Sequence, residues 1–235
     1  MYKKKIVFVE IFYLVLISIY SFSIFISGER TAFFNFIVYN LIFLIIFYDK
    51  LNIKKISTFF LLFAMFIIIS TIYDRNTFER YLIINKLNTN SSFKIFSDVH
   101  ENHYKTAYKI FQSHIIVGSG IKTFRHICKK NEFEPEGCAT HPHNTFMQFL
   151  SELGLLGLVF YILAFFYFSI KIIKLFLMKI NLKIYDDNFL IKTILTISIL
   201  ISLWPFSPSG NFFNNWLSIL TYLPIGILIF FDRKA

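Results

Sequence analysis

The chain has 235 residues, of which 56% are hydrophobic and 20% aromatic but only 16% are charged. A soluble globular protein is about 45–50% apolar and about 25% charged, so this composition excludes a soluble enzyme with a single core, a disordered tail and a disulfide-dense secreted domain. The formal charge of +10 would suit a nucleic-acid partner. The basic residues, however, lie in short clusters beside long apolar segments, a pattern typical of membrane topology signals. We therefore expect a membrane protein that binds no nucleic acid.

Six apolar segments are long enough, or nearly so, to cross a bilayer. A helix rises 1.5 Å per residue, and about 20 apolar residues cross about 30 Å of hydrocarbon. In chain order, the predicted spans cover residues 6–27, 32–48, 56–73, 144–170, 189–203 and 216–231. The sequence thus predicts an all-α, polytopic membrane helical bundle of about six transmembrane helices. It consists of three spans in 1–73, one long and partly helical loop in 74–143, and three spans in 144–235.

The lysine clusters predict how these spans are oriented. In a six-span chain the short clusters all fall on one side, at residues 3–5, 50–55, 171–183 and 233–234. Among the short connections on the other side, the only basic residue is Arg30. Since cytoplasmic loops are enriched in Lys and Arg, we expect both termini in the cytoplasm and the loop 74–143 outside.

The residues capable of acid–base or phosphate chemistry gather on this outer side. All six histidines lie between residues 100 and 143, together with both cysteines, Cys128 and Cys138. Four of the five arginines are outside as well, namely Arg30, Arg75, Arg80 and Arg125. The planar fork of arginine matches phosphate, which makes these residues candidates for binding one. A polar loop that simply collects polar residues would explain the same distribution.

Two local features stand out within the loop. A helix is predicted at residues 95–111, with an apolar face made of Tyr104, Ala107, Tyr108 and Phe111. Gly118-Ser119-Gly120 follows and precedes a short predicted helix at 121–130. The amides at the start of that helix could hold an anion, although a plain turn explains the glycines more simply.

His141-Pro142-His143-Asn144 leads into the fourth span. Proline suits the first turn of a helix, so we expect His143 at the outer mouth of this span. Within the helix, a polar stripe follows at i, i+4, i+7 and i+8, formed by Asn144, Gln148, Ser151 and Glu152. Polar groups at membrane depth are costly and mark functional pathways by default. Hydrogen bonding between helices is the structural alternative.

The cysteines allow two interpretations. Together with His141 and His143, Cys128 and Cys138 have spacings that would permit a zinc site. Two cysteines ten residues apart in an oxidising compartment form a disulfide more simply. We therefore predict a disulfide, no metal and no cofactor.

A third outer element lies between the last two spans. Residues 204–211 contain two prolines and a glycine, which break a helix, and Trp204 and Trp216 flank the segment. Broken backbone near membrane depth is tolerated where protein or a wet cavity satisfies it. This segment could form a rim around a site, and an ordinary turn is equally compatible.

Several of these motifs resemble the O-antigen ligase family, which shares its membrane domain with O-antigen polymerases. His143-Asn144, followed after nine residues by Gly154-Leu155-Leu156-Gly157, is similar to the family signature. The loop residues Tyr104, Ala107 and Phe111 with Gly118-x-Gly120, and the segment Ser27-Gly28-Glu29-Arg30, are similar to further family motifs. The resemblance covers about residues 20–220.

This resemblance implies metal-independent glycosyl transfer at the periplasmic face of the bacterial inner membrane. The donor would be a glycan on undecaprenyl diphosphate, and the acceptor a lipid A–core hydroxyl or a growing saccharide. The essential histidine of the family maps onto His143, with Asn144 beside it, and an essential arginine maps onto Arg30. Where many members carry another arginine this chain has His100, so Arg75, Arg80 or Arg125 would supply that charge. The substrate path would include His100, His141, Gln148 and Glu152.

The alternatives concern activity rather than architecture. Family members usually have about twice as many spans, so the chain resembles their C-terminal half, and a second membrane subunit could supply further helices. The chain could be a ligase, a polymerase, or a non-catalytic truncated member that binds the lipid-linked glycan. A transporter also needs polar groups inside a bundle, but it is disfavoured because nothing on the inner side matches the outer histidines and arginines.

Overall fold

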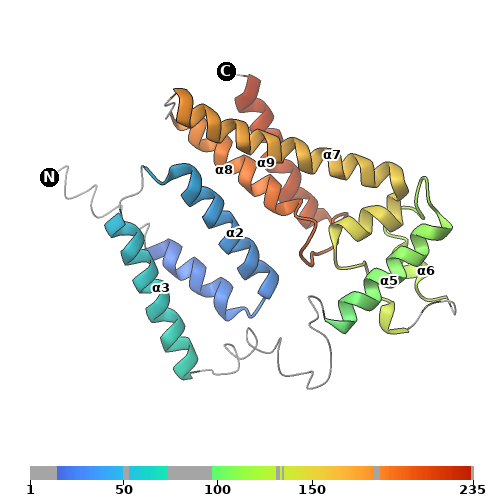
Figure 1. The fold of residues 1–235 in the computed structure, drawn as a ribbon. Coiled ribbons are helices and arrows are strands. Elements are labelled where there is room, and N and C mark those ends of the chain that lie inside the picture. Colours follow the sequence, from blue (N-terminus) through green and yellow to red (C-terminus); the bar gives the residue numbers. More distant parts are fainter. Residues whose placement is uncertain are drawn as a thin grey trace. The chain divides into compact units, whose positions relative to one another are not determined.

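The computed structural model describes residues 15–49, 53–73, 97–130, 133, 135–182 and 186–233. In these parts the chain is helical and contains no strand (Figure 1). It divides into two compact units, Met1–Phe93 and Lys94–Ala235. The fold is therefore all-α, as the sequence predicts.

The N-terminal unit contains three apolar helices, which correspond to the first three predicted spans: Val15–Ile26, α2 (Arg30–Phe47) and α3 (Ile53–Tyr73). Phenylalanine rings connect them, because Phe22 stacks on Phe66 with ring centroids 4.9 Å apart. Phe33 of α2 also reaches Phe63 of α3, at 6.4 Å. Aromatic packing of this kind holds apolar helices together where the hydrophobic effect between them is weak.

The C-terminal unit contains the described part of the long loop and the remaining apolar helices. Its elements are α5 (Asp98–Ser113), α6 (Phe124–Ile127), the 3-10 helix η2 (Pro135–Gly137), α7 (Thr145–Leu182), α8 (Asp187–Ser202) and α9 (Asn215–Arg233). Helix α8 packs against both α7 and α9, and the three run side by side in Figure 1. Helix α5 packs against α7, η2 and α6.

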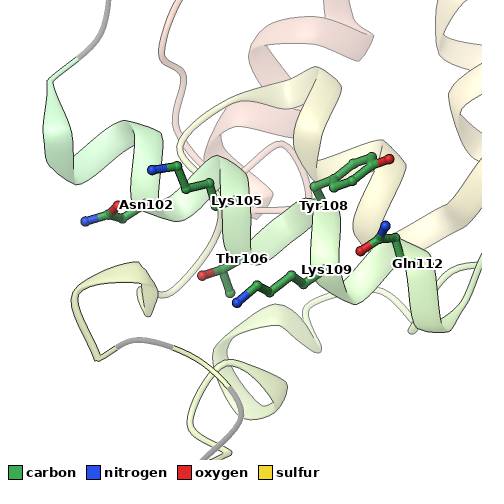
Figure 2. A pocket seen from close by; sticks show the side chains of 6 residues that line it. All are labelled: Asn102, Lys105, Thr106, Tyr108, Lys109 and Gln112. Carbon is green, nitrogen blue, oxygen red and sulfur yellow. The ribbon is translucent and has the colours of Figure 1, made fainter.

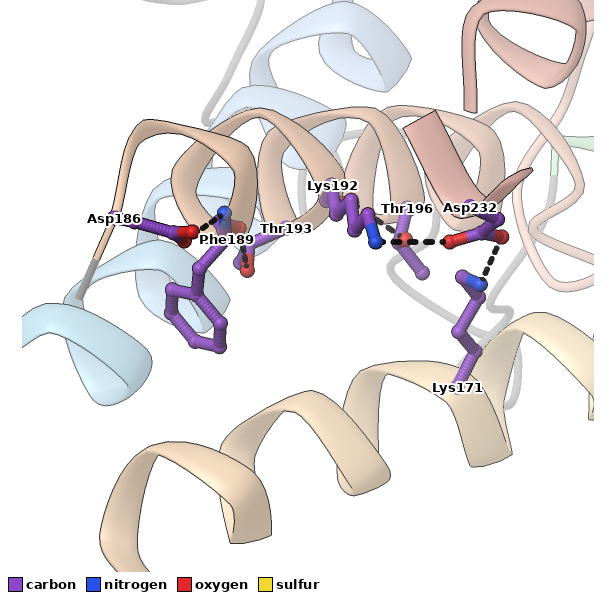
Figure 3. Close-up of polar contacts among 7 residues, drawn as sticks. All are labelled: Lys171, Asp186, Phe189, Lys192, Thr193, Thr196 and Asp232. Carbon is purple, nitrogen blue, oxygen red and sulfur yellow. Dashed lines mark hydrogen bonds and ion pairs between the residues drawn. The ribbon is translucent and has the colours of Figure 1, made fainter. Parts of the chain in front are cut away.

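A carboxylate near the C-terminal end of α9 connects α7, α8 and α9, as Figure 3 shows. Asp232 of α9 lies 2.5 Å from Lys171 of α7 and 3.6 Å from Lys192 of α8. These side chains are partly exposed, so each pair contributes little to stability.

Three helices among the described residues are long and apolar enough to cross a membrane, namely α2, α7 and α9. Shorter apolar stretches lie at Val15–Ile26 and Ser57–Ile69, and α8 has 16 residues. Large apolar side chains remain exposed along these helices, such as Leu61, Phe160 and Leu220. Contiguous exposed apolar surface of this extent marks contact with lipid or with other helices. The chain is thus a helical membrane protein.

Helix α7 breaks at Gly154, whose backbone angles are φ 64° and ψ −157°. Residues 115–120 fill this break with backbone hydrogen bonds. The amides of Ser119 and Gly120 donate to the carbonyls of Ser151 and Glu152, at 3.1 and 2.9 Å, and the amides at 155 and 156 donate to the carbonyls at 115 and 116. The peptide groups freed by the break therefore find partners in the loop.

The break requires glycine on both sides. A Cβ on Gly118 would lie 2.4 Å from the backbone of residues 152–154, and a Cβ on Gly154 would lie 2.4 Å from the amide nitrogen of Gly118. The glycines at 118 and 154 thus permit close approach of a loop to a broken helix. The amides of residues 118–120 donate to backbone carbonyls, so they do not bind an anion.

Two expectations for the loop need correction. Helix α5 buries His103, Thr106, Ala107 and Ile110, whereas Tyr108 of the predicted apolar face is exposed. The buried face of α5 differs from the predicted one because Ala107 and Ile110 pack with Phe124 and Cys128 in one core cluster. The helix predicted at 121–130 is only the four residues of α6.

Candidate functional site

Four histidines meet in the C-terminal unit. His100 and His103 lie at i and i+3 on α5, and His141 and His143 lie in the turn before α7. The ring of His143 is 4.1 Å from that of His141, 5.1 Å from that of His103 and 5.8 Å from that of His100, measured between centroids. Three of the four were predicted site residues. His103 was missed, although its i, i+3 spacing from His100 puts both rings on one side of a helix.

The turn that carries His143 is fixed by Asn144, which caps α7. The Oδ1 atom of Asn144 accepts from the amide of Met147 at 3.0 Å, and its Nδ2 donates to the carbonyls of Pro205 and Ser207 at 2.9 and 3.2 Å. The helix therefore begins after an asparagine cap. The expectation that Pro142 opens the helix is wrong.

His143 consequently lies just before the helix, in the left-handed backbone region, with φ 55°. A side chain there is uncommon and strained, and such strain clusters at functional sites. The carbonyl of His143 accepts from the amide of Ser209 at 2.9 Å. Together with the contacts of Asn144, this bond makes the segment 204–211 a rim packed against the histidine turn.

The two histidines of the turn differ in what their ring nitrogens do. His141 is buried, with Nε2 3.3 Å from the carbonyl oxygen of Ser209 and Nδ1 2.9 Å from the hydroxyl of Thr140. Since a carbonyl only accepts, Nε2 of the neutral ring carries the proton and Nδ1 accepts from Thr140. Neither nitrogen of His141 is left for a substrate.

The imidazole of His143, by contrast, contacts other imidazole rings. It is half-buried and lies between the rings of His141 and His103. Among the described residues, none hydrogen-bonds its imidazole. As far as the described part of the chain goes, both ring nitrogens of His143 are available to an incoming hydroxyl group.

Burial and mutual repulsion keep this cluster neutral. Burial, and next the charge of His100, lower the pKa of His143. Burial and the neighbouring histidines lower the pKa of His103 to about 4. Burial and His143 lower that of His141 to about 4, against the raising effect of its bond to Ser209. Near neutral pH all three rings are thus uncharged, and an uncharged imidazole can accept a proton.

The polar stripe of α7 is fully buried and bonded inside the protein. Gln148 donates to Glu152 at 3.0 Å and to Asn211 at 2.8 Å, and it accepts from the amide of Phe212 at 2.9 Å. Glu152 accepts from the amide of Phe124 at 3.3 Å. These bonds tie the first turns of α7 to residues 211–212 and to the start of α6.

The predicted arginines fall in different parts of the chain. Arg125 lies on α6, and its charge contributes to the lowered pKa of His141. Its Nε atom is buried and has no hydrogen-bond partner in the described part of the chain. Arg30 opens α2 in the N-terminal unit and is exposed. Arg75 and Arg80 lie outside the described residues.

Cys128 and Cys138 are joined in a disulfide, with their Cα atoms 5.1 Å apart. The bond connects the end of α6 to the residue after η2, next to the core of Ala107, Ile110 and Phe124. It anchors the stretch that leads to His141. Since both sulfurs are used, the zinc alternative loses its two thiolate ligands.

A pocket of about 390 Å³ adjoins the histidine turn. Most of its lining is apolar, and much of it is aromatic: Tyr104, Asn144, Phe146, Met147, Tyr161, Ile162, Phe165, Phe166, Pro205 and Phe206. Burial raises the pKa of Tyr104 to about 12, so its phenol stays protonated. The pocket suits an apolar ligand with one polar end.

A second pocket, of about 280 Å³, is lined by residues with polar side chains, including Lys105 and Lys109. Its described lining residues all belong to α5, and none is one of the four histidines (Figure 2). Its lining and that of the apolar pocket share no residue. This pocket is therefore not part of the histidine site.

Comparison with known proteins identifies the family. The family model described as O-antigen ligase matches residues 13–162. No curated protein and no solved structure matches the chain. The matched region covers more than half of the chain and includes the four clustered histidines, Asn144 and both glycines of the α7 break. The chain belongs to the O-antigen ligase family.

Proposed function

We propose that this protein is an O-antigen ligase-type membrane glycosyltransferase. It transfers a glycan from undecaprenyl diphosphate to a lipid A–core or saccharide hydroxyl at the periplasmic face of the inner membrane. The observation that carries the proposal is His143, an uncharged imidazole whose two nitrogens are bonded to no described residue. It contacts two other imidazole rings and precedes Asn144, which lines an apolar pocket. Family membership supplies the reaction class.

His143 is the general base in this proposal. It accepts the proton of the acceptor hydroxyl, and the oxygen bonds to the anomeric carbon of the donor. The bond from that carbon to the diphosphate oxygen breaks, and its electron pair leaves with undecaprenyl diphosphate. The lowered pKa of His143 keeps the ring unprotonated before the reaction and favours release of the proton afterwards.

The leaving diphosphate needs cations rather than an acid. Arg125 is the candidate in the C-terminal unit, because its buried Nε has no hydrogen-bond partner among the described residues and its charge contributes to the lowered pKa of His141. Arg30 is a candidate because of the family motif at residues 27–30, and Arg80 follows from the sequence alone. A guanidinium can bind two diphosphate oxygens at once and stabilise the charge that develops there.

The remaining predicted residues position the base. Asn144 holds the turn against the segment 204–211, and His141 supports one face of the His143 ring. Gln148 and Glu152 fix the first turns of α7. The apolar pocket beside Asn144 would accept the first isoprene units of the donor, which are the apolar part nearest the diphosphate.

A lipid-linked glycan transfer assay on the purified protein in proteoliposomes tests the proposal. His143→Ala should lower transfer about 10²–10⁴-fold, the range of general-base catalysis. His126→Ala removes an exposed histidine outside the cluster and serves as the matched control. If His143→Ala transfers normally while remaining folded and inserted, the assignment is wrong. If only His141→Ala is inactive, the base lies two residues earlier.

The same assay separates ligase from polymerase. Purified lipid A–core as the sole acceptor yields product only with a ligase, and a second lipid-linked repeat unit as the sole acceptor yields product only with a polymerase. A protein that binds the lipid-linked glycan but transfers to neither acceptor would be a non-catalytic family member.

A further inference from the structure

The turn between α5 and α6 presents aliphatic side chains outward. Ile116 and Val117 have 66% and 67% of their surface exposed, and Ile115 and Ile121 are exposed as well. Residues 115–121 carry no charge. Two exposed polar side chains flank them, His114 on one side and Lys122 on the other. In water, an exposed aliphatic tip of this size is unfavourable.

Part of the backbone of this turn is paired within the protein. The carbonyls of Ile115 and Ile116 accept from the amides at 155 and 156 at 2.8 and 3.1 Å, and the amide of Gly118 donates to the carbonyl of His114 at 3.0 Å. The amides of Ser119 and Gly120 are bonded to the end of the first part of α7. Irregular backbone is tolerated at membrane depth only where protein satisfies it in this way.

The exposed tip is continuous with the apolar outer face of α7. Leu155 and Leu156, whose amides bond the turn, are exposed, as are Phe160 and Leu163 farther along the same helix. The part of α7 after the break, from Leu155 to Leu182, has 28 residues, or about 42 Å at 1.5 Å per residue. This part alone is longer than the hydrocarbon layer, so the break can lie at its surface.

We propose that the turn formed by residues 115–121 inserts into the acyl chains of the leaflet on the histidine side, beside the break in α7. Lipid acyl chains are its partner, and Lys122 reaches the anionic headgroups. The turn and Gly154 then mark the edge of the hydrocarbon, and the histidine cluster lies at headgroup depth. The inference rests on the C-terminal unit alone and holds whether or not the protein transfers glycans.

A single cysteine at Val117 tests this in the full chain. The native cysteines, Cys128 and Cys138, are bonded to each other, so Val117→Cys can be labelled selectively with the fluorophore NBD. Proteoliposomes of phosphatidylethanolamine and phosphatidylglycerol then receive either nitroxide-labelled phospholipid or iodide in the water. Phe160→Cys, exposed on α7, is the lipid control, and Lys129→Cys, exposed on the outer loop, is the aqueous control.

We expect the label at 117 to behave like the label at 160, with emission at shorter wavelength, quenching by the acyl-chain nitroxide and protection from iodide. Iodide quenching as strong as at 129 would overturn the proposal, since the turn would then be in water. Protection from both quenchers would overturn it too, because protein would cover the turn. Ile116→Cys repeats the measurement if the first variant does not fold.

Discussion

Replacing Gly118 with alanine should separate the loop at residues 115–120 from the break in α7. The new Cβ would lie 2.4 Å from three backbone atoms of residues 152–154, and real Cβ contacts essentially never fall below 3.0 Å. Because the obstacle is backbone, no side chain can move aside. The residue also has φ +72°, a conformation that is strained for alanine.

The expected cost combines these two effects. Forcing a non-glycine residue into a strained region costs about 1–3 kcal/mol, and overpacking costs about 1–3 kcal/mol more. Gly118→Ala should therefore lower the free energy of unfolding by about 2–6 kcal/mol, a large share of the about 5–15 kcal/mol typical of folded proteins. Gly154→Ala should lower the free energy of unfolding by a similar amount, because Gly154 has φ +64° and its Cβ would lie 2.4 Å from the amide nitrogen of Gly118.

Two glycines of the same chain calibrate the measurement. Gly226 lies within α9, and a Cβ there meets nothing within 4 Å, so Gly226→Ala should be neutral or stabilise by up to about 1 kcal/mol. Gly120 has φ +108°, but its Cβ would meet only the side chain of Thr123, at 3.1 Å, so Gly120→Ala should give an intermediate cost.

The assay is unfolding of the purified protein in mixed micelles, followed by helical circular dichroism as the denaturing detergent SDS is added. Transfer activity, measured on the same preparations, reports on the site. If Gly118→Ala proves as stable as Gly226→Ala, the loop does not lie against the break in α7.

Three further predictions concern charge, topology and phosphate binding. His100→Asn removes a charge that lowers the pKa of His143, so this pKa should rise and more of the base should be protonated in acid. The acidic limb of the kcat/KM profile should therefore move to higher pH. A shift to lower pH contradicts the electrostatic argument. Alkaline phosphatase fused after Lys94 should be active and after Lys174 inactive, and the reverse result overturns the orientation. Arg30→Lys should lose most transfer, because lysine cannot bind two diphosphate oxygens as a fork; full activity excludes that role.

The sequence alone determined that the chain is an all-α membrane protein. Hydropathy is a local property of each segment, so the predicted spans correspond to helices wherever the structure describes them, and family membership follows the motif at His143, Asn144 and Gly154. The loop helix was also predicted, within a few residues of the observed Asp98–Ser113. The roles of His143 and of the arginines stay predictions until transfer is measured.

Tertiary structure decided how these elements meet. Gly118 and Gly154 are 36 residues apart in the chain, and no periodicity indicates that a loop fills the break of a helix there. The pairing of His103 with His143, and the use of both nitrogens of His141, depend in the same way on how α5 and the segment 204–211 pack against the start of α7. An apolar helix can be predicted from residues that are neighbours in the sequence. A hydrogen bond or a ring contact depends on where its partner lies in space, and only the folded chain determines that position.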